Sequence, residues 1–194
     1  MQPTSAQGFF HALYGDAVGW LVLWSSDDRG TRAVEAGHWA EAESIVRAAP
    51  ANNWYYGVGL QGRPPVGGRG TAADIVSIPG LWADLDHAEA AERKRARRRY
   101  PPAAEVEGIL GSLPIRPTVL VQTGGGVHAY WLFYEPLLIG CESDRMRAAR
   151  LSAGWQGTIR NALERAGGYE MDSTHDLARV LRVPGTHNQT QGVL

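Results

Sequence analysis

Two aspartates, Asp84 and Asp86, lie two residues apart inside the apolar stretch GLWADLD, residues 80–86. In a β-strand, side chains two residues apart project from the same face, so a strand here would place both carboxylates at one spot. Two carboxylates that close repel each other unless a cation or a shared proton compensates. Carboxylate oxygens suit Mg²⁺ or Mn²⁺, so the pair can hold one or two such ions. A strand end where both side chains reach water is the alternative.

A glycine-rich turn forms the second candidate, in QTGGGVHAYW, residues 122–131. Gly124, Gly125 and Gly126 lie between two expected strands and allow a ligand to approach the backbone closely. Backbone N–H groups in such a turn can bind phosphate oxygens. His128 begins the next strand, where it shares a face with Tyr130, and a purely structural role for it is the alternative. No Gly-Lys-Ser/Thr follows, so this is not a Walker loop.

The third candidate is MDSTHDLARVLRVPGTHN, residues 171–188. Asp172 ends a short strand-like step, whereas Asp176 can cap or begin a helix over DLARVLR. On that helix Arg179 and Arg182 would lie near each other and could face an anion; a solvated helix face is the alternative. Three acids, one histidine and two arginines together form a set suited to phosphoryl transfer.

Several strands and helices must position these residues. Apolar and aromatic runs predict strands at 19–25, 53–61, around Asp84, 117–123 and 127–136. Helical spacing predicts helices at 38–49, 104–113 and about 143–166, and Gly167 suits the end of the last one. The apolar stripe of that last helix is expected to consist of Leu151, Trp155, Ile159, Leu163 and Ala166. Alternating strands and helices indicate an α/β fold.

Composition and charge limit the partners. The 194 residues carry a formal net charge of −1, so any contact with nucleic acid needs a local basic patch. Such a patch exists in ERKRARRR, residues 92–99, where the arginines can grip a DNA backbone or simply form a solvated helix face. The arginines that we assign to this weak DNA-binding patch are Arg95, Arg97, Arg98 and Arg99.

The lone cysteine, Cys141, excludes internal disulfides and a cysteine-based zinc site. No apolar run approaches the roughly 20 residues that span a bilayer, and the N-terminus lacks a signal-peptide pattern. We therefore expect a cytoplasmic protein without membrane contact.

The order of the three candidates resembles that of the archaeo-eukaryotic primase superfamily, particularly the primase-polymerases of plasmids, phages and other mobile elements. WADLD resembles the first motif of that superfamily, QTGGGVHAYW the second, and DLARVLRVPGTHN the third. The resemblance spans roughly residues 75 to 190.

This resemblance implies an RRM-like antiparallel catalytic core beside an N-terminal α/β lobe. We expect one catalytic domain over residues 1–194, with the lobe at about 1–75 and the core at about 76–194. The abrupt ending of the sequence suggests the N-terminal part of a longer protein, with a helicase or another module downstream.

The resemblance also implies roles for single residues. Asp84, Asp86 and Asp172 would be catalytic and bind two Mg²⁺ or Mn²⁺ ions, with Asp176 as second choice for the third acid. The nucleotide-binding residues would be His128, Gly124, Gly125, Gly126, Arg179 and Arg182. The chain departs from the superfamily at Gly126, where many members have serine, and at residues 187–190, where many have a lysine. The single cysteine also excludes the zinc-binding insertion of some relatives.

The implied activity is template-directed transfer of nucleotides from (d)NTPs to a 3′-hydroxyl, with DNA template and primer as partners. Two alternatives remain: a catalytically silent nucleotide- or nucleic-acid-binding module, and a DxD-type metal-dependent glycosyltransferase. A rolling-circle initiator is excluded because no His-x-His occurs. De novo priming versus extension, and dNTP versus rNTP preference, stay open.

Overall fold

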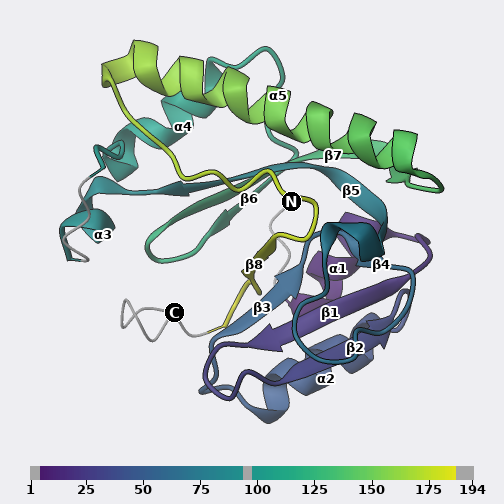
Figure 1. The fold of residues 1–194 in the computed structure, drawn as a ribbon. Coiled ribbons are helices and arrows are strands. Elements are labelled where there is room, and N and C mark those ends of the chain that lie inside the picture. Colours follow the sequence, from purple (N-terminus) through teal and green to yellow (C-terminus); the bar gives the residue numbers. More distant parts are fainter. Residues whose placement is uncertain (1–4, 94–97, 187–194) are drawn as a thin grey trace.

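The structure is a computed structural model that describes residues 5–93 and 98–186. Its strands are β1 (Trp20–Ser25), β2 (Thr31–Glu35), β3 (Trp54–Gly57), β4 (Leu60–Gln61), β5 (Ile75–Asp86), β6 (Val119–Gln122), β7 (Gly126–Leu138) and β8 (Val180–Arg182). Within the described residues they form one antiparallel sheet in the order β6-β7-β5-β4-β1-β3-β8, with β2 paired to β1 (Figure 1).

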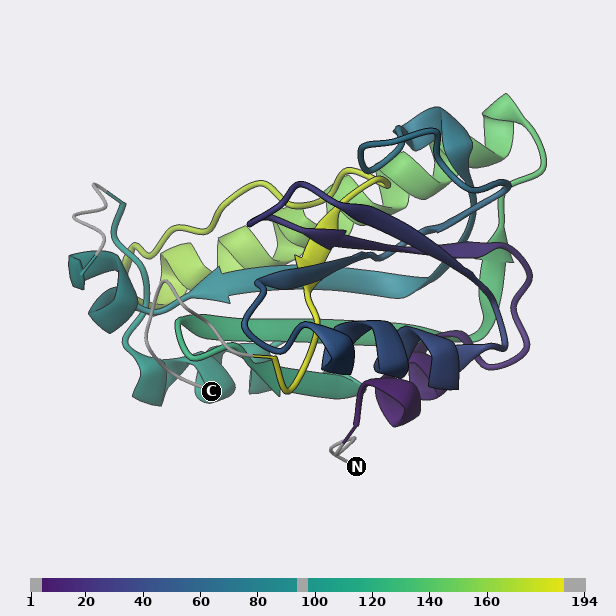
Figure 2. The same ribbon diagram turned by 90° about the horizontal axis from the view of Figure 1, so that it is seen from below.

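The helices cover this sheet from two sides. They are α1 (Ala6–Tyr14), α2 (Trp39–Ala48), α3 (Ala88–Arg93), α4 (Ala103–Gly111) and α5 (Glu142–Gly167), with a short 3₁₀ turn at Ala72–Asp74. In Figure 1, α4 and α5 lie above β5–β7 and α2 lies below β1–β3, while Figure 2 shows α1 and α2 side by side. The mixed α/β class with an antiparallel core, predicted from the sequence, is confirmed.

Strands β5 and β7 separate two hydrophobic clusters because their side chains alternate between faces. Leu81, Ala83 and Leu85 of β5 pack with Val127 and Ala129 of β7 against α4 and α5. The residues between them point the other way, where Trp82 and Tyr130 join the cluster that contains α1, β1 and β3. Asp84, Asp86 and His128 share this second face, so the alternation predicted for the candidate residues directs them toward the interior between the two halves of the sheet.

The stripe predicted for α5 is only partly correct. Ile159 and Leu163 are fully buried, but Leu151 is 43% exposed and Ala166 is exposed. Ser152 and Gln156, both polar, take buried positions on this helix instead. The helix also ends one residue later than predicted, at a C-cap formed by Gly168 in the left-handed conformation. Side-chain hydrophobicity alone could not identify a buried glutamine that serves as a hydrogen-bonding partner.

The segment DLARVLR is not the helix that its sequence suggested. Residues 176–179 form a turn, closed by the Arg179 N–H donating to the Asp176 carbonyl at 3.0 Å. Val180–Arg182 is strand β8, in register with β3 so that Arg182 lies opposite Tyr55. Seven residues are too few for a helix to be stable without packing, and pairing with the free edge of β3 satisfies the backbone instead.

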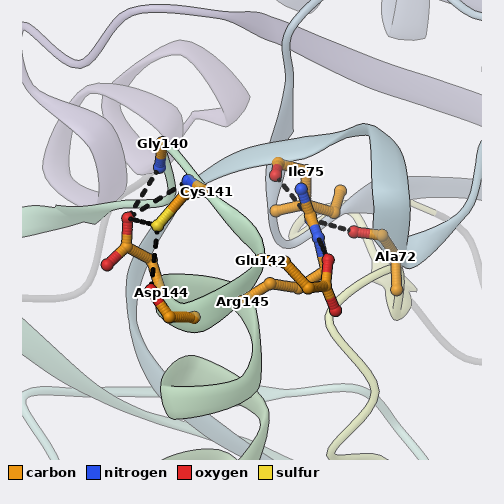
Figure 3. Close-up of polar contacts among 8 residues, drawn as sticks. Ala72, Ile75, Gly140, Cys141, Glu142, Asp144 and Arg145 are labelled. Carbon is orange, nitrogen blue, oxygen red and sulfur yellow. Dashed lines mark hydrogen bonds and ion pairs between the residues drawn. The ribbon is translucent and has the colours of Figure 1, made fainter.

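The start of α5 is fastened to the start of β5 (Figure 3). The Arg145 guanidinium donates to the carbonyls of Ala72 and Ile75. Beside it, the Asp144 carboxylate accepts hydrogen bonds from the Gly140 and Cys141 N–H groups at 3.1 and 3.2 Å and from the Cys141 thiol. These bonds fix where the long helix crosses the sheet.

Among the described residues, none of the helices is both long and apolar enough to cross a membrane.

We predict that Asp144→Asn destabilises the protein in a pH-dependent way. The thiol of Cys141 and the N–H of Gly140 lower the pKa of Asp144 below its ordinary value of 3.8. A lowered pKa stabilises the folded state above that value, and the stabilisation is lost as the pH falls through the folded-state pKa. Thermal unfolding should therefore show a lower Tm for the variant at pH 7 and equal Tm values near pH 2. A difference that does not change with pH would contradict the assignment.

Candidate active site

The predicted site residues from three separate motifs meet in one pocket of about 140 Å³. It lies on the inner face of β5 and β7, opposite β3 and β8. Asp84 and Asp86 come from β5, His128 from β7 and Arg182 from β8, while Gly125 lies in the turn before β7. The other lining residues are Tyr55, Thr123, Val180 and Leu181.

These residues of β5, β7 and β8 can line one pocket because the sheet curls. Strands β6 and β8 are at opposite ends of the strand order, yet residues 121–123 of the β6 end and residues 182–186 of the β8 end line one small pocket. The antiparallel strands, with their normal right-handed twist, thus bring both ends of the sheet around the same space. The catalytic candidates lie inside that curve rather than on an open face.

The pairing of β5 with β7 places the acids against the histidine. Asp84 is the cross-strand partner of His128, and Asp86 is the partner of Gly126. The Nε2 atom of His128 lies 3.5 Å from Oδ1 of Asp84. The His128 side chain is 5% exposed and that of Asp84 is 34% exposed, so the carboxylate reaches the pocket while the imidazole forms its floor.

His128 is a neutral imidazole at physiological pH. Burial, and next the positive charge of Arg182, lower its pKa to about 3, while the negative charge of Asp86 opposes them. A neutral imidazole carries one N–H donor and one acceptor nitrogen. It can therefore donate a hydrogen bond to an anionic ligand without adding a charge to the pocket.

Arg182 is held in place by Tyr55 of β3 and by Asn53, the residue before that strand. Its guanidinium donates to the Asn53 side-chain oxygen and to the Tyr55 hydroxyl, both at 3.0 Å, and lies 4.9 Å from the centre of the Tyr55 ring. Asn53 is in turn bonded to Asp27. A guanidinium fixed in this way is suited to bind phosphate oxygens. The sequence analysis missed Asn53 and Tyr55; the aromatic run WYY was the one signal for them.

Asp172 lies beside the pocket rather than in its lining. Its carboxylate pairs with Arg98 and accepts a hydrogen bond of 3.1 Å from the Tyr100 hydroxyl. Burial, then the charge and hydrogen bond of Asp172, and then the charge of Asp86 raise the pKa of Tyr100 to about 12. Tyr100 therefore bonds to Asp172 and lies within the electrostatic reach of Asp86.

The segment that carries Asp172 is fastened to β5 through buried side chains. Trp82 donates its indole N–H to the Thr174 carbonyl at 2.7 Å. Gln156 of α5 donates to the Thr174 hydroxyl at 2.8 Å and accepts from the Thr174 N–H at 3.1 Å. Gln156 is fully buried, so these bonds are protected from water. They fix Asp172 relative to Asp84 across more than 80 residues of sequence.

The remaining predicted residues have other partners. Arg179 pairs with Asp176 and donates to the Ser173 carbonyl, and neither Arg179 nor Asp176 lines the pocket. Among the described residues, no group of three or more His, Cys, Asp or Glu side chains is arranged to hold a metal ion.

The basic run near residue 95 is described only in part. Arg98 also lies 3.9 Å from Glu170, and Arg99 lies 5.3 Å from the centre of the Tyr169 ring. Arg95 and Arg97, like residues 187–190, lie outside the described residues. The weak DNA-binding assignment therefore stays a prediction.

The oxygen donors of the pocket fit a divalent cation. Asp84 and Asp86 line it from one strand face, and the cation Arg182 lines it from the opposite wall. The two carboxylates suit a hard ion, while His128 beside them and Arg182 opposite them suit the anion that such an ion would accompany.

The backbone of β5 leaves no room for a side chain at Gly126. A Cβ atom at this position would lie 2.2 Å from the carbonyl oxygen of Leu85 and 2.9 Å from Cα of Asp86. Real Cβ atoms do not approach backbone this closely, so any side chain here would push β7 away from the acids. Gly124, with a φ of 76°, makes the turn itself.

We predict that Gly126→Ala destabilises the protein by about 1–3 kcal/mol, the usual cost of overpacking. The matched control is Gly157→Ala in α5, where an added Cβ would meet nothing within 4 Å. This control should be neutral or stabilising by up to about 1 kcal/mol because alanine favours helix. Urea unfolding of both variants measures the difference. Equal stability of the two variants would contradict the close approach of β5 and β7.

Comparison with known proteins supports the fold. No protein-family model matches the chain, and no curated protein matches its sequence. Among solved structures, the AEP domain of the primase-polymerase (PrimPol) of cyanophage S-2L is similar, with a TM-score of 0.59 over 96% of this chain and 84% of that chain. The two sequences are 17% identical. The chain therefore has the fold of an archaeo-eukaryotic primase (AEP) domain.

Proposed function

We propose that the chain is the catalytic domain of a DNA primase-polymerase that transfers nucleotides from (d)NTPs to a 3′-hydroxyl with divalent metal. The observation that carries the proposal is the pocket that Asp84, Asp86 and His128 line from β5 and β7 and Arg182 lines from β8. Carboxylates for a metal ion, together with donors for phosphate oxygens, are what a metal–nucleotide complex requires. The fold shared with a phage PrimPol domain supports the same reading.

In this mechanism Asp84 and Asp86 would hold Mg²⁺ or Mn²⁺, which would supply Lewis-acid activation of the 3′-hydroxyl and charge stabilisation for the leaving pyrophosphate. His128 donates its N–H to the triphosphate as a neutral group. Arg182, fixed by Asn53 and Tyr55, neutralises a phosphate and orients the triphosphate for in-line attack.

We assign the third carboxylate to Asp172 in preference to Asp176. Asp172 bonds to Tyr100, which senses the charge of Asp86, whereas Asp176 pairs with Arg179 outside the pocket lining. Arg98 supplies a positive charge beside Asp172. Metal binding would replace one cation by another at this carboxylate.

The aromatic partner of the nucleotide is Tyr55 in this proposal. Tyr130, which shares a strand face with His128, is 1% exposed and packs against Phe9, so it is not accessible to a nucleotide. Tyr55 lines the pocket next to Arg182.

The basic run around Arg98 would contact the template backbone. The division into a lobe at about 1–75 and a core at about 76–194, with a further module downstream, is part of the same proposal.

We predict that the protein extends a labelled primer–template with Mg²⁺ or Mn²⁺ and all four dNTPs. Asp84→Ala/Asp86→Ala should abolish extension because both metal-binding carboxylates are lost. The matched control is Asp16→Ala, which removes an exposed aspartate in the loop after α1 and should retain wild-type activity. Gel analysis of the extension products, with circular dichroism to verify folding, measures the outcome.

Two results would contradict the proposal. Extension that survives in the double variant would exclude the metal assignment. A folded wild type that binds dNTPs with metal but extends no primer would instead indicate the silent binding module.

A second pair of variants tests whether Asp172 or Asp176 is the third metal-binding carboxylate. Asp172→Asn should reduce kcat by at least about tenfold, as expected when one metal ligand of a catalytic site is lost. Asp176→Asn removes a carboxylate that is bonded to Arg179 and does not line the pocket, so it should change kcat by less than twofold. Single-turnover primer extension measures both rates. The reverse order of effects would transfer the assignment to Asp176.

A further inference from the structure

A pair of buried tyrosines lies directly behind His128. The Tyr56 hydroxyl donates to the Tyr130 hydroxyl at 2.7 Å, and the side chains are 0% and 1% exposed. The Tyr130 hydroxyl lies 3.5 Å from Nδ1 of His128, at the long end of the hydrogen-bond range. Nε2, on the other side of the imidazole, lies 3.5 Å from the Asp84 carboxylate. The four side chains thus form a line from β3 to the acid of β5.

The direction of the hydrogen bonds along this line follows from the available protons. Burial raises the pKa of both tyrosines well above the ordinary value, so both hydroxyls keep their protons. Tyr56 donates to Tyr130, which leaves the Tyr130 proton for another acceptor. Nδ1 of His128 is the acceptor within reach. If Nδ1 accepts, it carries no proton, and the proton of the imidazole ring is then on Nε2, the nitrogen that faces Asp84 and the pocket.

We propose that Tyr130, oriented by Tyr56, is a positioning residue that holds His128 as its Nε2–H tautomer, so that an N–H donor faces the anionic ligand of the pocket. The tautomer follows from the geometry of the described residues. Only the identity of the ligand, a nucleoside triphosphate, rests on the proposed function.

The packing around the two rings supports a fixed orientation. Phe9 of α1 contacts both tyrosines edge-to-face, with ring centres 5.5 Å from Tyr56 and 5.7 Å from Tyr130. Phe10 contacts Tyr56 at 5.3 Å. The imidazole of His128 is nearly perpendicular to the Tyr130 ring, at 88°. Because Tyr56 belongs to β3 and Tyr130 to β7, the pair also joins the two walls of the pocket.

The experiment is ¹⁵N NMR of histidine-labelled protein, which separates the protonated ring nitrogen from the unprotonated one. Wild-type His128 should show one dominant tautomer with the proton on Nε2. Tyr130→Phe removes the hydroxyl but keeps the ring, and His128 should then become a mixture of tautomers. The matched control is Tyr14→Phe, which removes a buried hydroxyl that donates to the carbonyls of Gly57 and Val58 and should leave the His128 spectrum unchanged.

A kinetic measurement tests the consequence. Tyr130→Phe should raise the KM for dNTP by about two- to tenfold, the loss of one modest hydrogen bond, with a smaller change in kcat. Tyr14→Phe should lose comparable thermal stability without the KM effect, which separates positioning from a general loss of packing.

Two spectra would overturn the proposal. Wild-type His128 with its proton on Nδ1 would exclude it, even if the Tyr130 variant does not fold. A wild-type-like tautomer in folded Tyr130→Phe would exclude Tyr130 as its cause. Neither reading depends on polymerase activity, so failure of the proposed function and failure of this inference are distinguishable.

Discussion

The antiparallel register of β5 and β7 is the constraint on which the candidate site depends. It places Asp84 opposite His128 and Asp86 opposite Gly126, so two distant stretches of sequence meet as neighbours. A shift by one residue would turn both acids toward α4 and α5, because side chains alternate between faces. Two glycines hold the strands close: a Cβ at either Gly80 or Gly126 would lie 2.2 Å from a carbonyl oxygen of the opposite strand.

The curl of the sheet converts this pair of strands into an enclosed site. Pairing of β8 with β3 returns the end of the described chain to the acids, with Arg182 oriented by Tyr55. Enclosure also determines the electrostatics, since burial keeps His128 neutral beside a carboxylate and a guanidinium. The pocket thus combines two carboxylates and a neutral imidazole from β5 and β7 with a guanidinium from β8 on the opposite side.

The sequence predicted local features better than tertiary ones. Period-two alternation was sufficient to place Asp84 and Asp86 on one face and His128 on a strand after a glycine turn. Helical spacing was misleading for DLARVLR, because pairing with β3 outweighs it in so short a segment. The roles of Gln156, Asn53 and Tyr55 depend on partners about 18 to 130 residues away, and no local pattern encodes such contacts.

The central claim is that Asp84 and Asp86 hold a divalent metal ion against a triphosphate bound by His128 and Arg182. A crystal structure with Mn²⁺ and a non-hydrolysable dNTP tests it most directly, because anomalous scattering locates manganese independently of the protein model. The account predicts manganese between the two carboxylates, with phosphate oxygens within hydrogen-bond distance of His128 Nε2 and the Arg182 guanidinium. Manganese and triphosphate bound elsewhere, with these four side chains uninvolved, would contradict it.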